Sequence, residues 1–157
     1  MSKLARRSFL ALICSLAAAN IAAGFGSAEV RVPPSGRRVA LSGFDPVAYF
    51  TLGRPEKGSD VFWIAFDDVI YQFMNAQHRA MFAADPERYA PQYAGFCAAG
   101  VSRGETHEPD PESWAIVNGK LYVVALKERI EQFKKNPDRF IDNANANWPG
   151  LRNAPPN

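Results

Sequence analysis

Apolar and aromatic residues fall into two pairs of short runs, and each pair is separated by two turn-forming residues. In the first pair, Val61–Phe66 and Val69–Phe73 flank Asp67-Asp68. In the second pair, the runs flank Asn118-Gly119, a dipeptide that strongly favours a tight hairpin turn. The runs are rich in the β-branched and aromatic residues that strands prefer. The pattern therefore predicts two β-hairpins.

Helical signals follow each predicted hairpin. Asn75 can cap a helix that runs to about Ala84, and Asp85-Pro86 can open a second, short helix. Asn136-Pro137 repeats the second device. The segment between the second hairpin and this repeat is amphipathic, with one apolar stripe formed by Leu126, Ile130 and Phe133. We expect each half of the chain to contain, in this order, a strand, a turn, a second strand, a helix and a short helix.

The two halves match at a constant offset of 51 residues. Identical residues recur at this offset in five places: Trp63 and Trp114, Tyr71 and Tyr122, Phe82 and Phe133, Pro86 and Pro137, Arg88 and Arg139. The sequence therefore predicts a small, single α+β domain built from two ββα-like halves. At the same offset Cys97 aligns with Trp148, His78 with Arg129 and Met74 with Ala125. The sulfur and imidazole groups thus occur in one copy, where we expect any functional site.

The first 28 residues have the pattern of a cleavable export signal. A basic start containing Arg6 and Arg7 precedes an apolar run, and small residues up to Ala28 favour cleavage after that position. The run Arg6-Arg7-Ser8-Phe9-Leu10 is similar to a twin-arginine signal, and an ordinary secretory signal is the alternative. Either reading predicts an exported, periplasmic protein with no stable membrane span after cleavage.

Composition adds limits on function. The chain has 157 residues, 47% of them apolar, with 18 basic and 16 acidic side chains. Loss of the three basic residues in segment 1–28 leaves a mature chain of net charge −1, which gives no basic patch for nucleic acid.

We expect an extended arm at 29–40, the domain at 41–150 and a loose tail at 151–157, in a monomer. The sequence lacks a glycine-rich phosphate loop and a CxxCH motif, so we expect neither a nucleotide nor covalent haem.

Three stretches resemble the YHS domain family, and in particular its exported bacterial branch. They are Gly43-Phe44-Asp45-Pro46-Val47-Ala48-Tyr49-Phe50, the segment from Tyr71 through His78 to Tyr89, and Tyr93-Ala94-Gly95-Phe96-Cys97-Ala98. The resemblance covers most of residues 41–149. It implies a domain that accompanies metal-handling proteins, although the cysteine-rich cluster of many members is absent here. Relatives in the exported branch can carry selenocysteine at the Cys97 position, which implies redox or soft-metal chemistry there.

The resulting first hypothesis is a soft transition-metal site for metal handling or sensing. Cys97, His78 and Met74 offer thiolate, imidazole and thioether ligands, which suit copper better than zinc. Asp45 and Tyr93 are the residues that we expect to orient these ligands. For each ligand a structural role is the alternative: a buried thiol, a hydrogen-bonded histidine, a core methionine. His107 is expected in a solvated acidic loop.

Two other readings stay open. Cys97 is the single cysteine after the predicted signal, which itself contains Cys14. As a redox thiol it would form a sulfenic acid or a mixed disulfide and would need a thiol from a partner. The third reading is a non-catalytic interaction module that binds a metal-handling or thiol protein. A Cys97–His78 hydrolase dyad with Asp45 rests on residue type alone, so we do not expect an enzyme.

Overall fold

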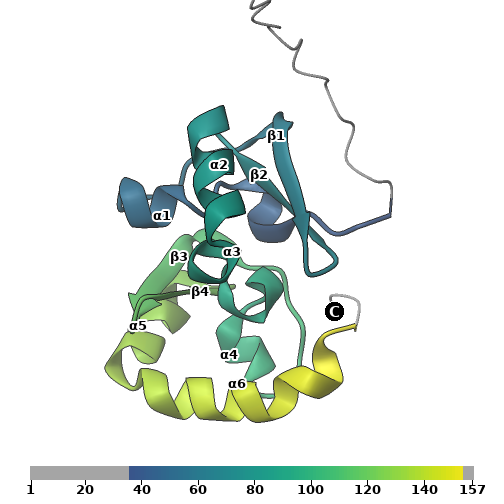
Figure 1. Ribbon diagram of the computed structural model, residues 1–157. Coiled ribbons are helices and arrows are strands. Elements are labelled where there is room, and N and C mark those ends of the chain that lie inside the picture. The colour runs from purple at the N-terminus through teal and green to yellow at the C-terminus, as the bar shows by residue number, and fades with distance from the viewer. Residues whose placement is uncertain (1–35, 154–157) are drawn as a thin grey trace, which may run out of the picture.

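The computed structural model describes residues 36–153. Figure 1 shows an α+β fold in two halves, one containing the first hairpin and the other the second hairpin with a long helix beneath it. The two 3-10 turns are η1 (Ala40–Gly43) and η2 (Gln92–Gly95). The strands are β1 (Ser59–Phe66), β2 (Val69–Phe73), β3 (Asp110–Val117) and β4 (Lys120–Val124). The helices are α1 (Ala48–Thr51), α2 (Ala76–Ala84), α3 (Pro86–Tyr89), α4 (Ala98–Val101), α5 (Lys127–Lys135) and α6 (Pro137–Leu151).

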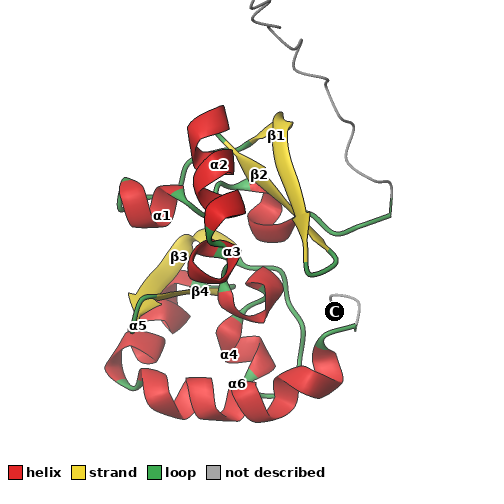
Figure 2. Cartoon of the chain, viewed as in Figure 1, coloured by secondary structure: helices red, strands yellow, loops and turns green. Residues whose placement is uncertain are grey.

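Both predicted hairpins are confirmed. Strand β1 pairs with β2, and β3 pairs with β4, each as a separate antiparallel two-stranded sheet (Figure 2). Asp67 and Asp68 both have positive φ, as do Asn118 and Gly119, so both turns have the backbone twist that suits a tight hairpin. The register irregularity between Ser59 and Trp63 recurs between Asp110 and Trp114, at the offset of 51 residues.

The predicted helix starts are also confirmed, but Asn136 does not repeat the cap, since its side chain makes no cap hydrogen bond before α6. The Asn75 side chain accepts a hydrogen bond from the His78 amide at 2.8 Å, and Asp85 accepts one from the Arg88 amide at 3.2 Å. Such bonds satisfy amides that have no partner within the first helical turn. The expected stripe on α5 is right for Ile130 and Phe133, which are buried, but wrong for Leu126, which precedes the helix and is exposed.

The second half departs from the prediction at its end. The helix that begins at Pro137 is not short: α6 has 15 residues, whereas α3 has four. Its apolar residues pack against the core of the second half, with Ala144 fully buried and Phe140, Ile141 and Trp148 partly buried. This packing carries α6 past Pro149, and Leu151 belongs to the helix rather than to a loose tail. Part of the expected arm is also in the fold, since Val39 bridges to Ile70 and Ala40 is buried.

Strand β4 joins the two halves. Its side chains alternate, so that Leu121 and Val123 pack in the core of the first half while Tyr122 and Val124 pack in the core of the second. The first core contains the large buried residues Leu41, Tyr49, Tyr71, Phe73 and Phe82. Among residues 36–153, no helix is long and apolar enough to cross a membrane.

Candidate functional site

Cys97 lies at the start of α4, directly after the η2 turn. Its Sγ atom accepts hydrogen bonds from the Ala125 amide at 3.1 Å and from the Gly100 amide at 3.4 Å. The residue is 3% exposed. Within residues 36–153 no acceptor is placed for the thiol proton, whereas two donors point at the sulfur. The sulfur is therefore an acceptor of two backbone hydrogen bonds.

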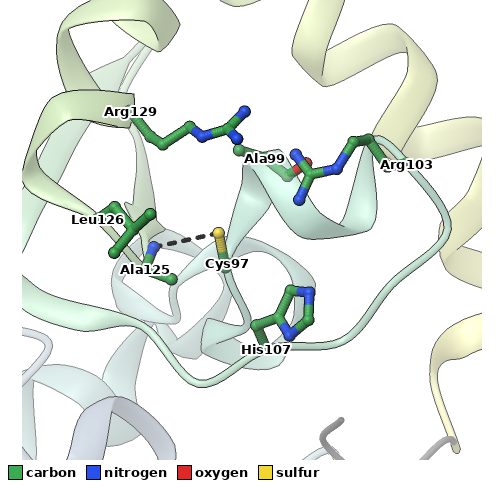
Figure 3. A pocket seen from close by; sticks show the side chains of 7 residues that line it. All are labelled: Cys97, Ala99, Arg103, His107, Ala125, Leu126 and Arg129. Atoms are coloured by element: carbon green, nitrogen blue, oxygen red, sulfur yellow. Dashed lines mark hydrogen bonds between the residues drawn. The ribbon is translucent and has the colours of Figure 1, made fainter.

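A pocket of about 300 Å³ opens over the Cys97 sulfur. Figure 3 shows that Arg103, His107 and Arg129 surround it. Arg103 follows α4, His107 lies in the loop before β3, and Arg129 belongs to the first turn of α5. Small or apolar side chains form the rest of the wall: Ala99, Ala125 and Leu126. The pocket is therefore cationic around a buried sulfur.

The two arginines differ in their hydrogen-bond partners. Arg103 donates to the Ala99 carbonyl at 2.5 Å and to Glu105 Oε2 at 3.1 Å. The same Glu105 oxygen lies 3.0 Å from Nε2 of His107. These bonds, first from His107 and then from Arg103, hold the pKa of the exposed Glu105 carboxyl below its usual value. The guanidinium of Arg129, in contrast, has no ion pair or side-chain hydrogen bond with another residue of the described chain.

A second polar site lies in the first half, around the fully buried Asp45. Its Oδ2 atom lies 2.7 Å from Nδ1 of His78 and accepts a hydrogen bond from the Met74 amide at 2.9 Å. Its Oδ1 atom accepts one from the Val47 amide at 2.8 Å. Nε2 of His78 lies 3.4 Å from the Thr51 hydroxyl. Every oxygen of this buried carboxylate is thus hydrogen-bonded, as burial of a charge requires.

These two sites are copies of each other. Leu41-Ser42-Gly43-Phe44-Asp45 and Tyr93-Ala94-Gly95-Phe96-Cys97 adopt the same left-handed turn, with positive φ at the first three residues of each. The Asp45 amide donates to the Glu56 carbonyl, and the Cys97 amide donates to the His107 carbonyl. Met74 and Ala125, which follow β2 and β4, then supply the amide bound by the respective side chain.

The repeat therefore starts earlier than the sequence indicates. The turn motif recurs at an offset of 52 rather than 51, because the segment before β3 is one residue shorter than the segment before β1. The alignment of Cys97 with Trp148 is wrong: Cys97 corresponds to Asp45. In the same way, Arg129 is the third residue of α5 and corresponds to His78, the third residue of α2.

Each turn is also supported by a cation, although the two cations come from positions that are not equivalent in the repeat. Lys57 donates to the Ser42 carbonyl at 2.6 Å and lies over the Phe44 ring. Arg38 donates to the Ala94 carbonyl and lies 3.9 Å from the Phe96 ring centroid. Burial lowers the pKa of Arg38, and the adjacent Glu108 opposes this shift.

The structure does not bring the predicted metal ligands together. His78 and the Met74 amide belong to the Asp45 site, whereas Cys97 lies in the pocket with His107, and the two sites share no lining residue or hydrogen-bond partner. The Met74 side chain is 38% exposed. Within the described part of the chain, no three His, Cys, Asp or Glu side chains are grouped as metal ligands would be. The repeat explains the separation, because it places one site in each half.

The other predicted residues have varied outcomes. Asp45 contacts His78, the ligand that it was expected to orient. Tyr93 instead faces α6, where its hydroxyl donates to Asn145 at 3.0 Å. Burial raises the pKa of Tyr93. His107 is not in a solvated acidic loop alone, since it lines the Cys97 pocket. Arg6, Arg7 and Ala28 lie outside the described residues.

Sequence reasoning missed the cationic wall of the pocket. Arg129 could have been found, because it aligns with His78 at the repeat offset. Arg103 and His107 carry no comparable signal, because each lies in the irregular segment between α4 and β3.

Comparison with known proteins does not assign this chain to a family. Neither a protein-family model, nor a curated protein, nor a solved structure matches the chain. The functional argument therefore rests on the site.

Proposed function

We propose that this protein is an exported thiol redox protein in which Cys97 is the reactive group. One observation carries the proposal: the buried Cys97 sulfur accepts two amide hydrogen bonds at the base of a pocket lined by Arg103, His107 and Arg129. Cysteines react as nucleophiles in surroundings that contain amide donors and cationic side chains, and the Cys97 sulfur has both around it.

The first half of the chain supports this assignment. At the equivalent position it holds Asp45, a carboxylate, with the same strand-end amide and with His78 as the partner. The fold thus uses this position in both halves for a side chain that accepts the strand-end amide. In the first half this side chain is closed off by its partners, whereas in the second half it lines a pocket.

The chemistry follows from a single cysteine. The Cys97 thiolate attacks one sulfur of a disulfide, so that a new Sγ–S bond forms, the old S–S bond breaks, and the second sulfur leaves as a thiolate that takes a proton from water. A thiol from a partner then attacks the mixed disulfide and releases Cys97 again as a thiolate. The partner must supply this thiol, since the chain after residue 28 has no second cysteine.

The location and family are part of the proposal. The signal-like segment 1–28 favours export to the periplasm, and the motifs around Asp45, His78 and Cys97 resemble the exported branch of the YHS domain family. Thiol chemistry is favoured over copper binding at Cys97 for an electrostatic reason. Two guanidinium groups line the pocket, and they repel a metal cation while they attract an anion.

The test compares the native and unfolded states of one protein. In a Cys14→Ser chain, Cys97 is the single thiol, and intact mass spectrometry follows its reaction with the neutral hydroxyethyl disulfide. We expect the native chain to react at least as fast as the same chain unfolded in urea, because activation offsets burial. Slower reaction by a factor of about 100 in the native state would identify Cys97 as a protected core thiol and overturn the proposal.

A variant of the pocket wall tests whether that wall activates the Cys97 thiol. His107→Gln removes one polar group from the pocket wall, and it should slow the native reaction while leaving the reaction of the unfolded chain unchanged. Metal analysis of the purified chain, beside Cys97→Ser, tests the copper hypothesis directly: one equivalent of copper in the first protein and none in the second would support it against ours.

A further inference from the structure

The Cys97 pocket restricts its partner by size. A volume of about 300 Å³ is at the lower end of the range for small-molecule sites. The sulfur lies at the base of this pocket and the residue is 3% exposed, so a cysteine on the flat surface of a folded protein does not reach it. A short, slender thiol or disulfide does.

The pocket also selects by charge. Arg103 is held by the Ala99 carbonyl and by Glu105, which neutralises it in part. Arg129 has neither kind of partner in the described chain, and it lines the pocket on the side of Ala125 and Leu126 (Figure 3). A free guanidinium beside a reactive sulfur is a ready partner for a carboxylate, to which its fork of N–H donors is matched.

We infer that the partner of Cys97 is a low-molecular-mass thiol or disulfide that carries a carboxylate, and that Arg129 binds this carboxylate. The inference rests on the proposed thiol function and names its substrate class. Cys97 attacks the nearer sulfur of the bound disulfide, the Sγ–S bond replaces the S–S bond, and the other half leaves as a carboxylate-bearing thiol after protonation by water. A second molecule of that thiol reverses the reaction.

The experiment uses three symmetric disulfides of similar length and different charge. These are dithiodipropionate, which is dianionic at neutral pH, hydroxyethyl disulfide, which is neutral, and cystamine, which is dicationic. Rates of adduct formation on the Cys14→Ser chain are measured at low ionic strength by intact mass spectrometry. Each rate is divided by the rate of the same disulfide with free thioglycerol, a neutral thiol that differs from all three probes, which removes its intrinsic reactivity.

We expect the normalised rate to fall in the order dithiodipropionate, hydroxyethyl disulfide, cystamine, by about fivefold or more at each step, and the differences to shrink at high salt. Arg129→Gln should lower the normalised rate of dithiodipropionate to that of hydroxyethyl disulfide, as the loss of one charge contact predicts. The same variant should change the rate of hydroxyethyl disulfide by less than about twofold. The control is Lys135→Gln, which makes the same charge change on the same helix at an exposed residue outside the pocket wall.

The outcomes distinguish a failure of the carboxylate inference from a failure of the proposed thiol function. If all three probes react with Cys97 at equal normalised rates, or if Lys135→Gln has the effect of Arg129→Gln, the carboxylate inference is overturned and the thiol function stands. If none of the probes forms an adduct with the folded chain, the thiol function fails as well. Circular dichroism of each variant verifies that the fold is intact.

Discussion

Arg129 occupies, in the second half of the molecule, the position that His78 occupies in the first. Each is the third residue of the helix after a hairpin, and each lies beside a buried side chain that binds the amide after the second strand of that hairpin. The first copy is complete in itself, because Asp45 and His78 bind each other. The second copy leaves Arg129 and the Cys97 sulfur on the wall of a pocket. The same arrangement, a buried side chain that binds the amide after the hairpin, thus stabilises the first half and forms the candidate site in the second.

The equivalence of Asp45 and Cys97 predicts which substitutions the Cys97 position accepts. Cys97→Asp supplies a carboxylate to the Ala125 and Gly100 amides, whereas Cys97→Ala leaves the Ala125 amide without its acceptor. An unsatisfied buried amide costs about 1–3 kcal/mol. We therefore expect Cys97→Asp to unfold at a higher urea concentration than Cys97→Ala. The control is Ala98→Asp at the neighbouring buried residue, which has no such donors and should be the least stable of the three. Equal loss of stability in Cys97→Asp and Ala98→Asp would contradict the equivalence.

Asp45 is predicted to be the most sensitive polar residue of the fold. Its two oxygens accept bonds from the Val47 and Met74 amides and contact His78, all at a residue with no exposed surface. Removal of one partner from a buried, hydrogen-bonded pair costs about 3–5 kcal/mol. Asp45→Ala should therefore lower the free energy of unfolding by that amount in urea denaturation. Asp60→Ala, at an exposed position, should change it by less than about 0.5 kcal/mol.

The hairpins, helix starts and α+β class could be predicted from local signals. Asn118-Gly119, Asn75 and Asp85-Pro86 each fix a turn or cap through their own backbone and side-chain chemistry, independent of distant residues. The pocket could not be predicted in this way, because tertiary packing brings Arg129 of α5 to Cys97 and Arg103, which flank α4.

Two further features were missed for specific reasons. The early start of the repeat was hidden by a one-residue difference in the loop before β3, which shifts the offset from 51 to 52. The length of α6 was missed because Asn136-Pro137 repeats Asp85-Pro86, which opens a helix of four residues, whereas contacts of α6 with the second core carry it to Leu151.

Arg38 and Lys57 perform the same task in the two halves and should differ in their effect on stability. Arg38 is 18% exposed in its side chain, contacts the Phe96 ring and pairs with Glu108, whereas Lys57 is exposed. A guanidinium that packs on a ring and binds a buried carbonyl contributes more than a solvated ammonium. We expect Arg38→Ala to cost about 2 kcal/mol and Lys57→Ala less than about 1 kcal/mol in thermal or urea unfolding. Equal costs would show that packing of the arginine stem is unimportant.

Buried tyrosines predict how stability depends on alkaline pH. Burial raises the pKa values of Tyr49, Tyr71 and Tyr93 in the folded chain above the ordinary value near 10. The unfolded chain therefore loses these phenolic protons first as the pH rises. Since the folded state then binds more protons than the unfolded state, these phenols should lower the free energy of unfolding as the pH rises above about 10 and should contribute no pH dependence near neutral pH.

The variant Tyr71→Phe tests whether ionisation of a buried phenol causes this loss of stability, because it leaves the hydrogen bonds of the fold unchanged. No hydrogen bond of the Tyr71 hydroxyl occurs within residues 36–153, so the variant removes a buried ionisable group and little else. Each such group steepens the decline by up to about 1.4 kcal/mol per pH unit, and the variant should make the decline shallower by that amount. Urea unfolding at a series of pH values measures the slope, and tyrosinate absorbance shows when the phenols ionise. Because the absorbance reports all five tyrosines, the difference between the wild-type chain and Tyr71→Phe isolates the Tyr71 phenol. This difference should appear together with the loss of circular dichroism, and its appearance before unfolding would mean that the Tyr71 phenol ionises in the native fold.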